Sequence, residues 1–375
     1  MTTKSVRLFH FFAFLTQNSL RALKLAFLLL IYTSAGFSQV PFWHAGLFTF
    51  FDNNEFGKSA VKIPQTMAGV MIAPEIGLVW DSVHRINTGV NLMHEFGSPD
   101  FSGKVYPTAY YDYSSKPFMF IMGAFPRSEV LDKYPRLFFQ DSVSYYRPNM
   151  NGIFCQYGKE NYHIDLWLDW TGRQSFSDRE TFFVGISGRY NTGMLYAQHF
   201  SYMYHFAGRM NPVFNEALHD NCLFLTSAGI DLSEKTFFDR LEANAGWVLG
   251  LERARADNTG WIAMHGLLIE TKAEYRFAGL FNTFYQGRGQ MYFYNNHDID
   301  LYWGDPVYRA RTYNRTDFYL CFLNKKTLNL ELTYSLHILE GRVYHEQLLK
   351  VRVNLCGTFS LSNRQNNKQL VSQRI

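Results

Sequence analysis

The chain has no hydrophobic run long enough to form a membrane-spanning helix. The apolar core near its amino terminus, from Leu25 to Tyr32, is about half of the roughly 20 residues that such a helix needs. The first 38 residues contain no acid and four basic residues, which are Lys4, Arg7, Arg21 and Lys24. We therefore predict that residues 1–38 are a secretory signal peptide that is cleaved after Ser38.

Cysteine is also scarce. The four cysteines, Cys155, Cys222, Cys321 and Cys356, lie far apart and form no CxxC pair or Cys/His cluster. This spacing lacks the usual zinc-binding patterns, so we expect no metal site and no cofactor. An exported protein can form disulfides, but the spacing identifies no pairs, and we favour separate small side chains in a barrel wall.

The mature chain lacks an excess of either charge sign. The whole chain has 36 basic and 32 acidic residues, and the predicted signal peptide contains four of the basic ones. The remainder is formally neutral, which gives no support to a nucleic-acid partner. Linkers and low-complexity tracts are absent too, so we predict one domain over residues 39–361 and a polar tail over residues 362–375.

What the chain has in abundance is alternation with a period of two residues. In "HIDLWLDW", the apolar residues Ile164, Leu166, Leu168 and Trp170 alternate with His163, Asp165 and Asp169, and Trp167 is an exception on the polar side. Such alternation is typical of β-strands and is too regular for helices.

Residues 182–206 show the same alternation in two arms joined by a tight turn, which predicts a β-hairpin. The second arm has one face of aromatic residues, which are Tyr196, Phe200, Tyr202, Tyr204 and Phe206. Its other face contains Ala197, His199, Ser201 and His205. We expect the aromatic face to contact lipid and the histidine face to line a wet lumen.

Sixteen segments of this kind follow one another, at 43–52, 66–80, 84–97, 104–114, 117–126, 149–159, 162–172, 181–190, 194–206, 222–233, 239–252, 261–277, 280–290, 316–324, 328–339 and 348–361. Short turns alternate with longer connections, at 53–65, 98–103, 127–148, 173–180, 207–221, 253–260, 291–315 and 340–347. Transmembrane barrels have short turns at one end and longer loops at the other, and they close because hydrocarbon leaves no partner for a free sheet edge. We predict an all-β protein, a transmembrane antiparallel up-and-down β-barrel of about 16 strands, with 14 or 18 as alternatives.

This pattern, with its amino-terminal signal and with Phe359 near the end of the last strand, resembles the porin-type outer-membrane barrels of Gram-negative bacteria. The chain departs from that family by continuing past the last strand to Ile375. The resemblance implies an outer-membrane location and contact with outer-membrane lipid, and it leaves a homo-oligomer open.

A barrel of about 16 strands is wide enough for an aqueous channel, so we expect passive diffusion of small hydrophilic solutes. In porin-like proteins the third outer loop often narrows the channel, and an ordinary capping loop is the alternative. The candidate constriction and pore-lining residues carry both charge signs, which predicts weak ion selectivity. They are Arg127, Glu129, Asp132, Lys133, Arg136, Asp141, Arg147, Asp165, Asp169, Arg189, Glu242, Glu331, Lys350 and Arg352.

Two other functions stay open. Residues 291–315 mix aromatic and acidic residues, so Tyr302, Trp303 and Asp305 are candidates for carbohydrate contact, and the barrel could anchor adhesive surface loops. A barrel hydrolase is the second alternative. However, "GISG" around Ser187 is not a GxSxG elbow, and "HDID" at 297–300 has no identifiable nucleophile. We therefore expect no catalytic residue and no enzymatic activity.

Overall fold

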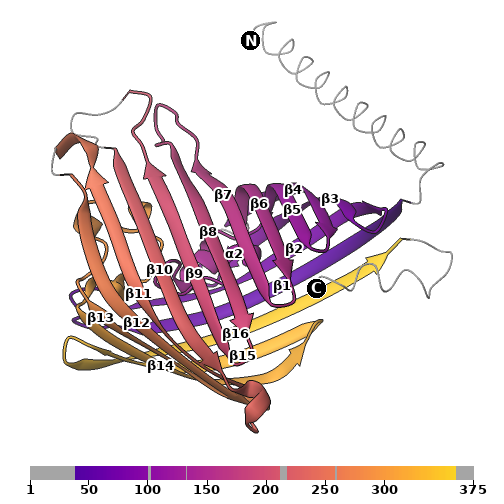
Figure 1. Cartoon of the computed structure of the whole chain (residues 1–375). Helices are drawn as coiled ribbons and strands as arrows, with labels where there is room; N and C mark the ends of the chain where they lie inside the picture. Colours follow the sequence, from indigo (N-terminus) through magenta and orange to yellow (C-terminus); the bar gives the residue numbers. More distant parts are fainter. Residues whose placement is uncertain (1–38, 100–102, 132, 212–217, 258–259, 360–375) are drawn as a thin grey trace, which may run out of the picture.

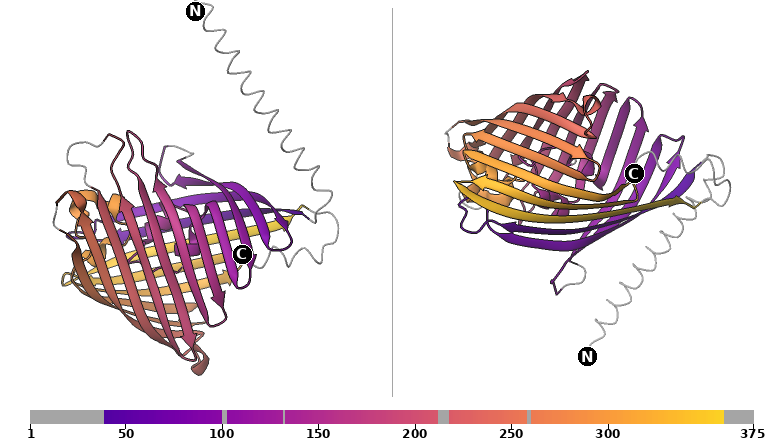
Figure 2. Two further views of the ribbon diagram at one scale, coloured as in Figure 1. Left: turned by 45° about the horizontal axis from the view of Figure 1, so that its top comes forward. Right: turned by 90° about the horizontal axis from the view of Figure 1, so that it is seen from below.

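The computed structural model describes residues 39–99, 103–131, 133–211, 218–257 and 260–359. The predicted signal peptide and the polar tail lie outside these residues and stay predictions. Sixteen antiparallel strands form one closed barrel, in which each strand pairs with its neighbours in sequence and β1 pairs with β16 (Figures 1 and 2). This confirms the predicted fold class and strand number.

The strands are β1 (Val40–Glu55), β2 (Gln65–Trp80), β3 (His84–Glu95), β4 (Lys104–Ser115), β5 (Phe118–Pro126), β6 (Asn149–Lys159), β7 (Tyr162–Gly172), β8 (Thr181–Thr192), β9 (Leu195–Phe206), β10 (His219–Asp231), β11 (Arg240–Ala254), β12 (Ile262–Tyr275), β13 (Ala278–Gly287), β14 (Thr312–Lys325), β15 (Leu328–Leu339) and β16 (Arg342–Thr358). The short helices include α2 (Ser128–Leu131), α3 (Asp141–Tyr146), α4 (Tyr294–Leu301) and η4 (Pro306–Arg309). Among the described helices, none combines the length and the apolar character that a membrane crossing requires.

The two ends of the barrel differ in the length of their connections. The start of β1 and the end of β16 lie at the same end, where Phe42 pairs with Thr358, and most turns there have two or three residues. The opposite end has the long connections, including residues 127–148 and 288–311. By the general rule for these barrels, the short-turn end faces the periplasm and the other end faces outward.

One predicted connection is wrong. We expected residues 340–347 to form a loop, but β15 ends at Leu339 and β16 begins at Arg342, which pairs with it. The ladder continues through residues 342–347 because they keep alternating between the two faces of the wall, with Tyr344 and Glu346 buried. The last outward connection is therefore a tight turn.

The alternation on β7 separates lipid-facing from interior side chains as expected. Ile164 and Leu166 are 59% and 49% exposed, whereas Asp165, Trp167 and Asp169 are almost completely buried. Residues directly opposite each other on neighbouring strands share a face, so this assignment extends around the barrel through the strand register.

The same register corrects the predicted orientation of β9. Tyr202 pairs with Gly185 and Tyr204 pairs with Phe183, and both partners are buried on the interior side of β8. The aromatic face of β9 therefore lies inside the barrel, and its histidine face, with His199 and His205, points toward lipid. The prediction was the reverse. The aromatic face is buried because the interior is filled with protein rather than with water.

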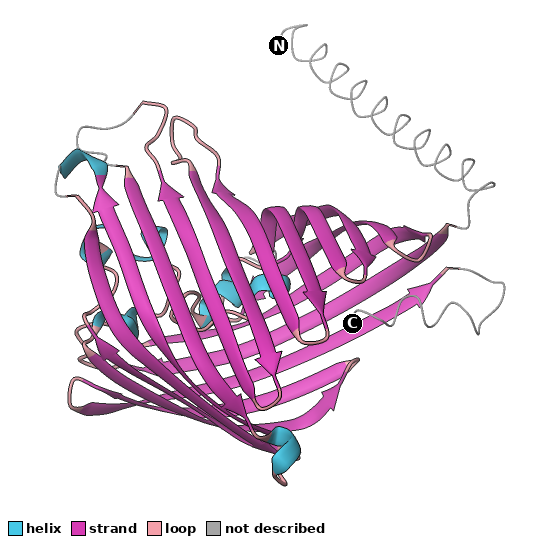
Figure 3. Ribbon diagram, viewed as in Figure 1, coloured by secondary structure: helices cyan, strands magenta, loops and turns pink. Residues whose placement is uncertain are grey.

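Two loops supply this filling, and we call them together the plug: residues 127–148 and residues 288–311. The helices of the first loop lie inside the ring of strands (Figure 3), and the second loop has Leu301, Tyr302 and Val307 buried. Phe138 and Phe139 pack against Tyr202, with ring centroids 5.5 and 5.8 Å apart, and Trp303 packs against Phe183 at 4.9 Å. Interior aromatic side chains of β8 and β9 thus complete a core with the plug.

The two loops of the plug also bind each other. The Gln140 amide donates to the Trp303 carbonyl at 2.8 Å, and the Asp305 amide donates to the Arg136 carbonyl at 2.9 Å. At Gly304, an added Cβ would lie 2.1 Å from the Leu137 carbonyl oxygen, so only glycine permits this approach. The plug is therefore one packed unit.

Replacing Trp167 measures how much this core contributes to stability. Its indole is 1% exposed, donates to the Tyr134 hydroxyl at 3.0 Å, and packs against Phe139 and Phe183. Trp167→Ala should lower the free energy of unfolding by about 3–5 kcal/mol, as expected for a large buried aromatic residue. The measurement is denaturant unfolding in detergent or vesicles.

Trp170→Ala is the matched control, because Trp170 lies on the same strand but is 42% exposed on the lipid-facing side. Its loss should be clearly smaller. Equal losses for the two variants would mean that the interior packing of Trp167 adds nothing beyond lipid contact.

The four cysteines are all free, as the favoured interpretation had it. Cys155, Cys222 and Cys321 are partly buried in the wall, and Cys356 is exposed near the end of β16.

Candidate active site

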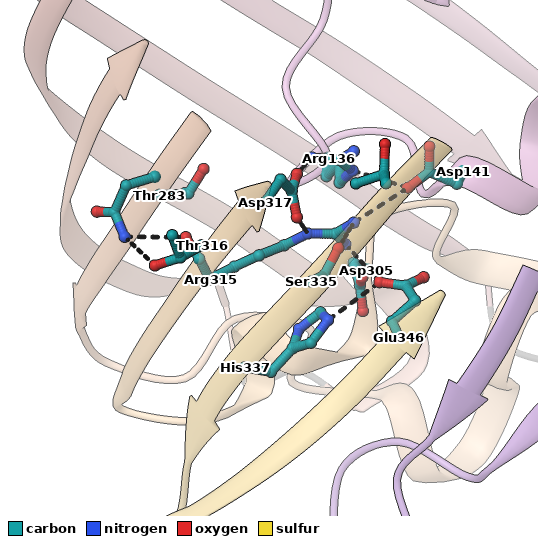
Figure 4. A network of polar contacts seen from close by, with 12 residues as sticks. Arg136, Asp141, Thr283, Asp305, Arg315, Thr316, Asp317, Ser335, His337 and Glu346 are labelled. Atoms are coloured by element: carbon teal, nitrogen blue, oxygen red, sulfur yellow. Dashed lines mark hydrogen bonds and ion pairs between the residues drawn. The ribbon is translucent and has the colours of Figure 1, made fainter. Parts of the chain in front are cut away.

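Charged residues of the predicted constriction hold the plug to the barrel wall. Arg136 donates to Asp141 at 2.7 Å and to Asp317 on β14 at 3.0 Å, and Lys350 on β16 donates to Asp141 at 2.8 Å. Arg315 continues the network to Asp317 at 2.6 Å (Figure 4). These pairs are interior and close, so they fix one position of the loop.

The wall side of this network is buried. Arg315 also pairs with Glu346 at 3.0 Å, and Glu346 accepts a hydrogen bond from His337 at 3.0 Å (Figure 4). Each of these three side chains is at most 2% exposed. Breaking one member of such a group leaves an unpaired buried charge, which is strongly destabilising.

Asp141 is the plug residue on which these cations converge. Burial disfavours its charged form, but Arg136, Lys350 and Arg315 outweigh that effect and hold the pKa of its carboxyl well below the usual value. Since the folded pKa is lowered, the stabilisation is present at neutral pH and is lost only when the pH falls through that low pKa. Mild acid should therefore leave the ion pairs of Asp141 with Arg136 and Lys350 in place.

The other predicted lining residues are also mostly paired. Arg127 is buried against Asp169 and lies over the Trp303 ring at 5.0 Å, and Arg147 lies over the same ring at 4.1 Å. Lys133 donates to Asp165 at 2.9 Å. The side chain of Glu129 and all of Asp132 lie outside the described residues.

A polar cavity of about 540 Å³ remains in the barrel below the plug. It contains Arg189, which pairs with Glu242 at 3.5 Å, together with Glu331, Lys350 and Arg352. Arg352 lies over the Phe48 ring at 4.9 Å. The structure thus brings part of the predicted lining together around a chamber, whose roof includes the plug residues Phe139 and Tyr308.

The three carbohydrate candidates lie in the plug. Tyr302, Trp303 and Asp305 are each about 2% exposed. Tyr302 donates to Glu252 on β11, and Asp305 accepts from Lys62 at 3.0 Å. A sugar in the outer medium does not reach these side chains in this conformation, because other protein groups already occupy their surfaces and hydrogen bonds.

A different group of polar residues lies on the lipid-facing side of the wall. His199 pairs in register with Gly188 on β8 and with Thr226 on β10, and Ser201 pairs with Ile186 and Phe224. Ile186 is 47% exposed on this side. Polar side chains facing hydrocarbon are costly and rare, so their presence suggests a functional site.

These residues form a continuous hydrogen-bonded relay. The Ser201 Oγ lies 3.0 Å from His199 Nε2, and His199 Nδ1 lies 2.8 Å from Thr226 Oγ1. A nucleophile within reach of a base, with the base oriented by a third group, is the arrangement used by serine hydrolases. Here a hydroxyl group, not a carboxylate, is the third group.

The surroundings of the relay leave it accessible from one direction. Ser201 is 7% exposed, because it is recessed between the larger side chains of Ile186 and Phe224. Next to the imidazole lie Gly188 and Ala197, which add little bulk on that side. The Ser201 hydroxyl also lies 3.3 Å from the Ile186 carbonyl oxygen, which is a second acceptor for its proton.

Sequence reasoning missed this site because it assigned the wrong orientation to β9. His199 and Ser201 are two residues apart and therefore share a face, which is visible in the sequence. The useful signal was on β8, where Gly185, the register partner of Tyr202, leaves interior space that the Trp167 indole fills. That signal requires the register between the two strands.

The closed barrel, the difference between its two ends and its apolar outer face define an outer-membrane β-barrel protein. A family model described as Lipid A 3'-O-deacylase-type matches residues 42–362. The chain therefore belongs to the Lipid A 3'-O-deacylase-type family. This membership overturns the expectation of no enzymatic activity, because the family is one of enzymes.

Solved structures support the fold. A loop-deletion mutant of OmpT, an outer membrane protein of Vibrio cholerae, has a TM-score of 0.52 at 10% identity and covers 85% of this chain and 100% of its own. The anion-selective porin from Comamonas acidovorans has a TM-score of 0.51 at 9% identity and covers 85% and 99%. A further OmpT structure, at a TM-score of 0.50, is a trimer. At these identities the likeness concerns the barrel fold alone.

The search of curated proteins returned no match. The likeness to porin structures is one of fold, so it supports an outer-membrane barrel and not a particular porin family.

Proposed function

We propose that this protein is a hydrolase of membrane lipid that removes an ester-linked acyl chain, with Ser201 as the nucleophile. The observation that carries the proposal is the Ser201–His199–Thr226 relay on the lipid-facing side of the barrel. The family membership supports it and points to lipid A as the substrate.

Each residue has a chemical role in this proposal. His199 Nε2 takes the proton of the Ser201 hydroxyl as the oxygen attacks the ester carbonyl carbon, and the alcohol of the glycolipid leaves with that proton. Thr226 accepts from His199 Nδ1–H and so holds the tautomer in which Nε2 is free to act as the base. Water then hydrolyses the acyl-serine, which releases a fatty acid and restores the hydroxyl.

The position of the site suits a substrate that stays in the membrane. An acyl chain that lies along the outer surface of β9 and β10 can bring its ester to Ser201 without leaving the lipid phase. Gly188 and Ala197 add little bulk of their own beside the imidazole, so an ester group can approach it from the lipid. Holding the reacting groups together in this way lowers the entropic part of the barrier.

The test is a lipid assay with the purified, refolded protein. Lipid A in mixed micelles should lose the mass of one acyl chain, and a free fatty acid should appear in equal amount. Intact lipid A after long incubation, with a barrel shown to be folded, would contradict the proposal.

Passive diffusion of small hydrophilic solutes is the second candidate, and the polar chamber of about 540 Å³ favours it. The plug opposes it, because Leu137, Phe138 and Val307 are essentially fully buried within the barrel where a channel would have to pass. Solute flux through this protein would require the plug to move. A homo-oligomer, as in the trimeric OmpT structure, is compatible with either function.

A further inference from the structure

A second polar group lies on the same lipid-facing side, at the outward end of the wall. His205 on β9, Asp220 on β10 and Arg253 on β11 are register partners, so they form one row across three strands. Arg253 Nε donates to Asp220 at 2.7 Å, and His205 Nδ1 lies 3.6 Å from the same carboxylate. Arg255 joins them from the connection that follows β11, donating to both Asp220 oxygens at 2.9 and 3.0 Å.

This rim cluster, His205, Asp220, Arg253 and Arg255, has more positive than negative charge. Two guanidinium groups share one carboxylate, and Asp220 is only 5% exposed beneath them. The arginine side chains remain 34% and 50% exposed, so they present unused N–H groups to the surroundings. Asp220 thus orients the arginines without occupying all their donors.

The arginines are also positioned by an aromatic residue. The Arg253 guanidinium lies 4.4 Å from the centroid of the Trp261 ring, and Trp261 is 47% exposed just before β12. Tryptophan is typical of the boundary between hydrocarbon and headgroups. The rim cluster is therefore at the height of lipid headgroups on the outward side of the barrel.

The distance to the proposed nucleophile suits a single lipid. Ser201 and His205 are on the same face of β9 and four residues apart, which is about 13 Å along a strand. Between them, facing lipid, lies Met203, whose partners are Val184 and Cys222. An apolar strip thus connects a cationic site at the rim with the ester-cleaving site deeper in the wall.

We propose that Arg253 and Arg255 bind the phosphate group of an anionic membrane lipid and so place its acyl ester over Ser201. This rests on the proposed function for the role of Ser201, but the phosphate site itself does not require catalysis. Arginine is suited to this task, because its planar donors match phosphate oxygens in pairs. His205, whose Nδ1 lies 3.6 Å from Asp220, is a further polar group of the same site.

The test separates binding from turnover by using Ser201→Ala protein in phosphatidylcholine nanodiscs. The probes are diphosphorylated lipid A, the same lipid with its phosphates removed, and inorganic phosphate, with bound lipid counted by native mass spectrometry. We expect the diphosphorylated lipid to bind at least about tenfold more tightly than the phosphate-free lipid, as for loss of a charge-assisted hydrogen bond. Inorganic phosphate that competes would show that the site binds phosphate from either source, and failure to compete would assign it to lipid-borne phosphate.

The decisive variant combines Arg253→Gln and Arg255→Gln in one protein. Arg288→Gln is the matched control. Arg288 is exposed at the same end of the barrel, but it donates to the Ala263 carbonyl and not to Asp220. The double variant should lose the preference for phosphate, and the control should keep it. Equal binding of both lipids by the parent, or an unchanged preference in the double variant, would overturn the proposal.

Two checks separate a loss of phosphate binding from misfolding of the barrel. Heat-modifiable gel migration reports whether each variant forms a closed barrel, and His205→Gln provides a milder change in the same cluster that should weaken binding without abolishing it. If Ser201 proved not to be the nucleophile, Ser201→Ala would still release fatty acid while the phosphate preference remained.

Discussion

Ser201→Ala is expected to lower the rate of acyl release by about 10³-fold or more, because losing the nucleophile of a hydrolase removes the covalent route altogether. His199→Gln should have a similar effect, since the remaining serine has no base. Thr226→Val should lose less, about tenfold to a hundredfold, because it disturbs only the orientation of the imidazole. The measurement is initial rates of fatty-acid release from lipid A.

Ser187→Ala is the matched control for this series. Ser187 lies on β8 opposite Phe200, next to Ser201 in the register, but it faces the interior and donates to Asp165 at 3.2 Å. Its removal should leave the rate within about twofold, as expected for a side chain away from the reacting groups. Full activity of Ser201→Ala would contradict the assignment of Ser201 as the nucleophile. A loss in Ser187→Ala as large as in Ser201→Ala would point to an active site in the barrel interior.

The plug should close the barrel to small solutes. We expect the intact protein to show almost no flux of small sugars in a liposome-swelling assay, because two packed loops close the interior. A variant in which short Gly-Ser linkers replace residues 129–146 and 290–309 should swell liposomes readily. A barrel of about 16 strands leaves a water-filled passage once its interior is clear.

A single substitution provides a second test in case the variant with replaced loops does not fold. Gly304→Val places a side chain where an added Cβ already meets the Leu137 carbonyl at 2.1 Å, and it should force the two loops apart while the wall stays intact. Rapid flux through the unaltered protein would contradict the closed interior. Absence of flux in both variants, with folded barrels, would mean that side chains of the barrel wall, and not the plug, block the passage.

Much of the architecture could be predicted from the sequence, because alternation and turn placement are local signals. The run from Ile164 to Trp170 has its apolar residues, apart from Trp167, on one face, and the structure places that face outward. The number of strands followed from counting such runs. The prediction of a loop at 340–347 was wrong because the two turn residues, Glu340 and Gly341, were not distinguished from the strand that follows them.

The site could not be predicted in the same way, because period two separates two faces without saying which one meets lipid. On β9 both faces contain aromatic or polar residues, and the aromatic face was assigned to lipid by analogy with the other strands. What reverses the assignment is the plug: Phe139 and Trp303 lie far from β9 in sequence and fill the interior beside it. Such long-range packing leaves no local signal.

Covalent labelling can show whether the lipid-facing hydroxyl of Ser201 is the nucleophile. The folded, active protein is treated with a lipophilic fluorophosphonate, digested, and mapped by mass spectrometry. We expect one modified residue, Ser201, with acyl release falling in step with its labelling and with no adduct in His199→Gln. Complete inactivation with the adduct on another serine, or full activity with Ser201 quantitatively modified, would contradict the account.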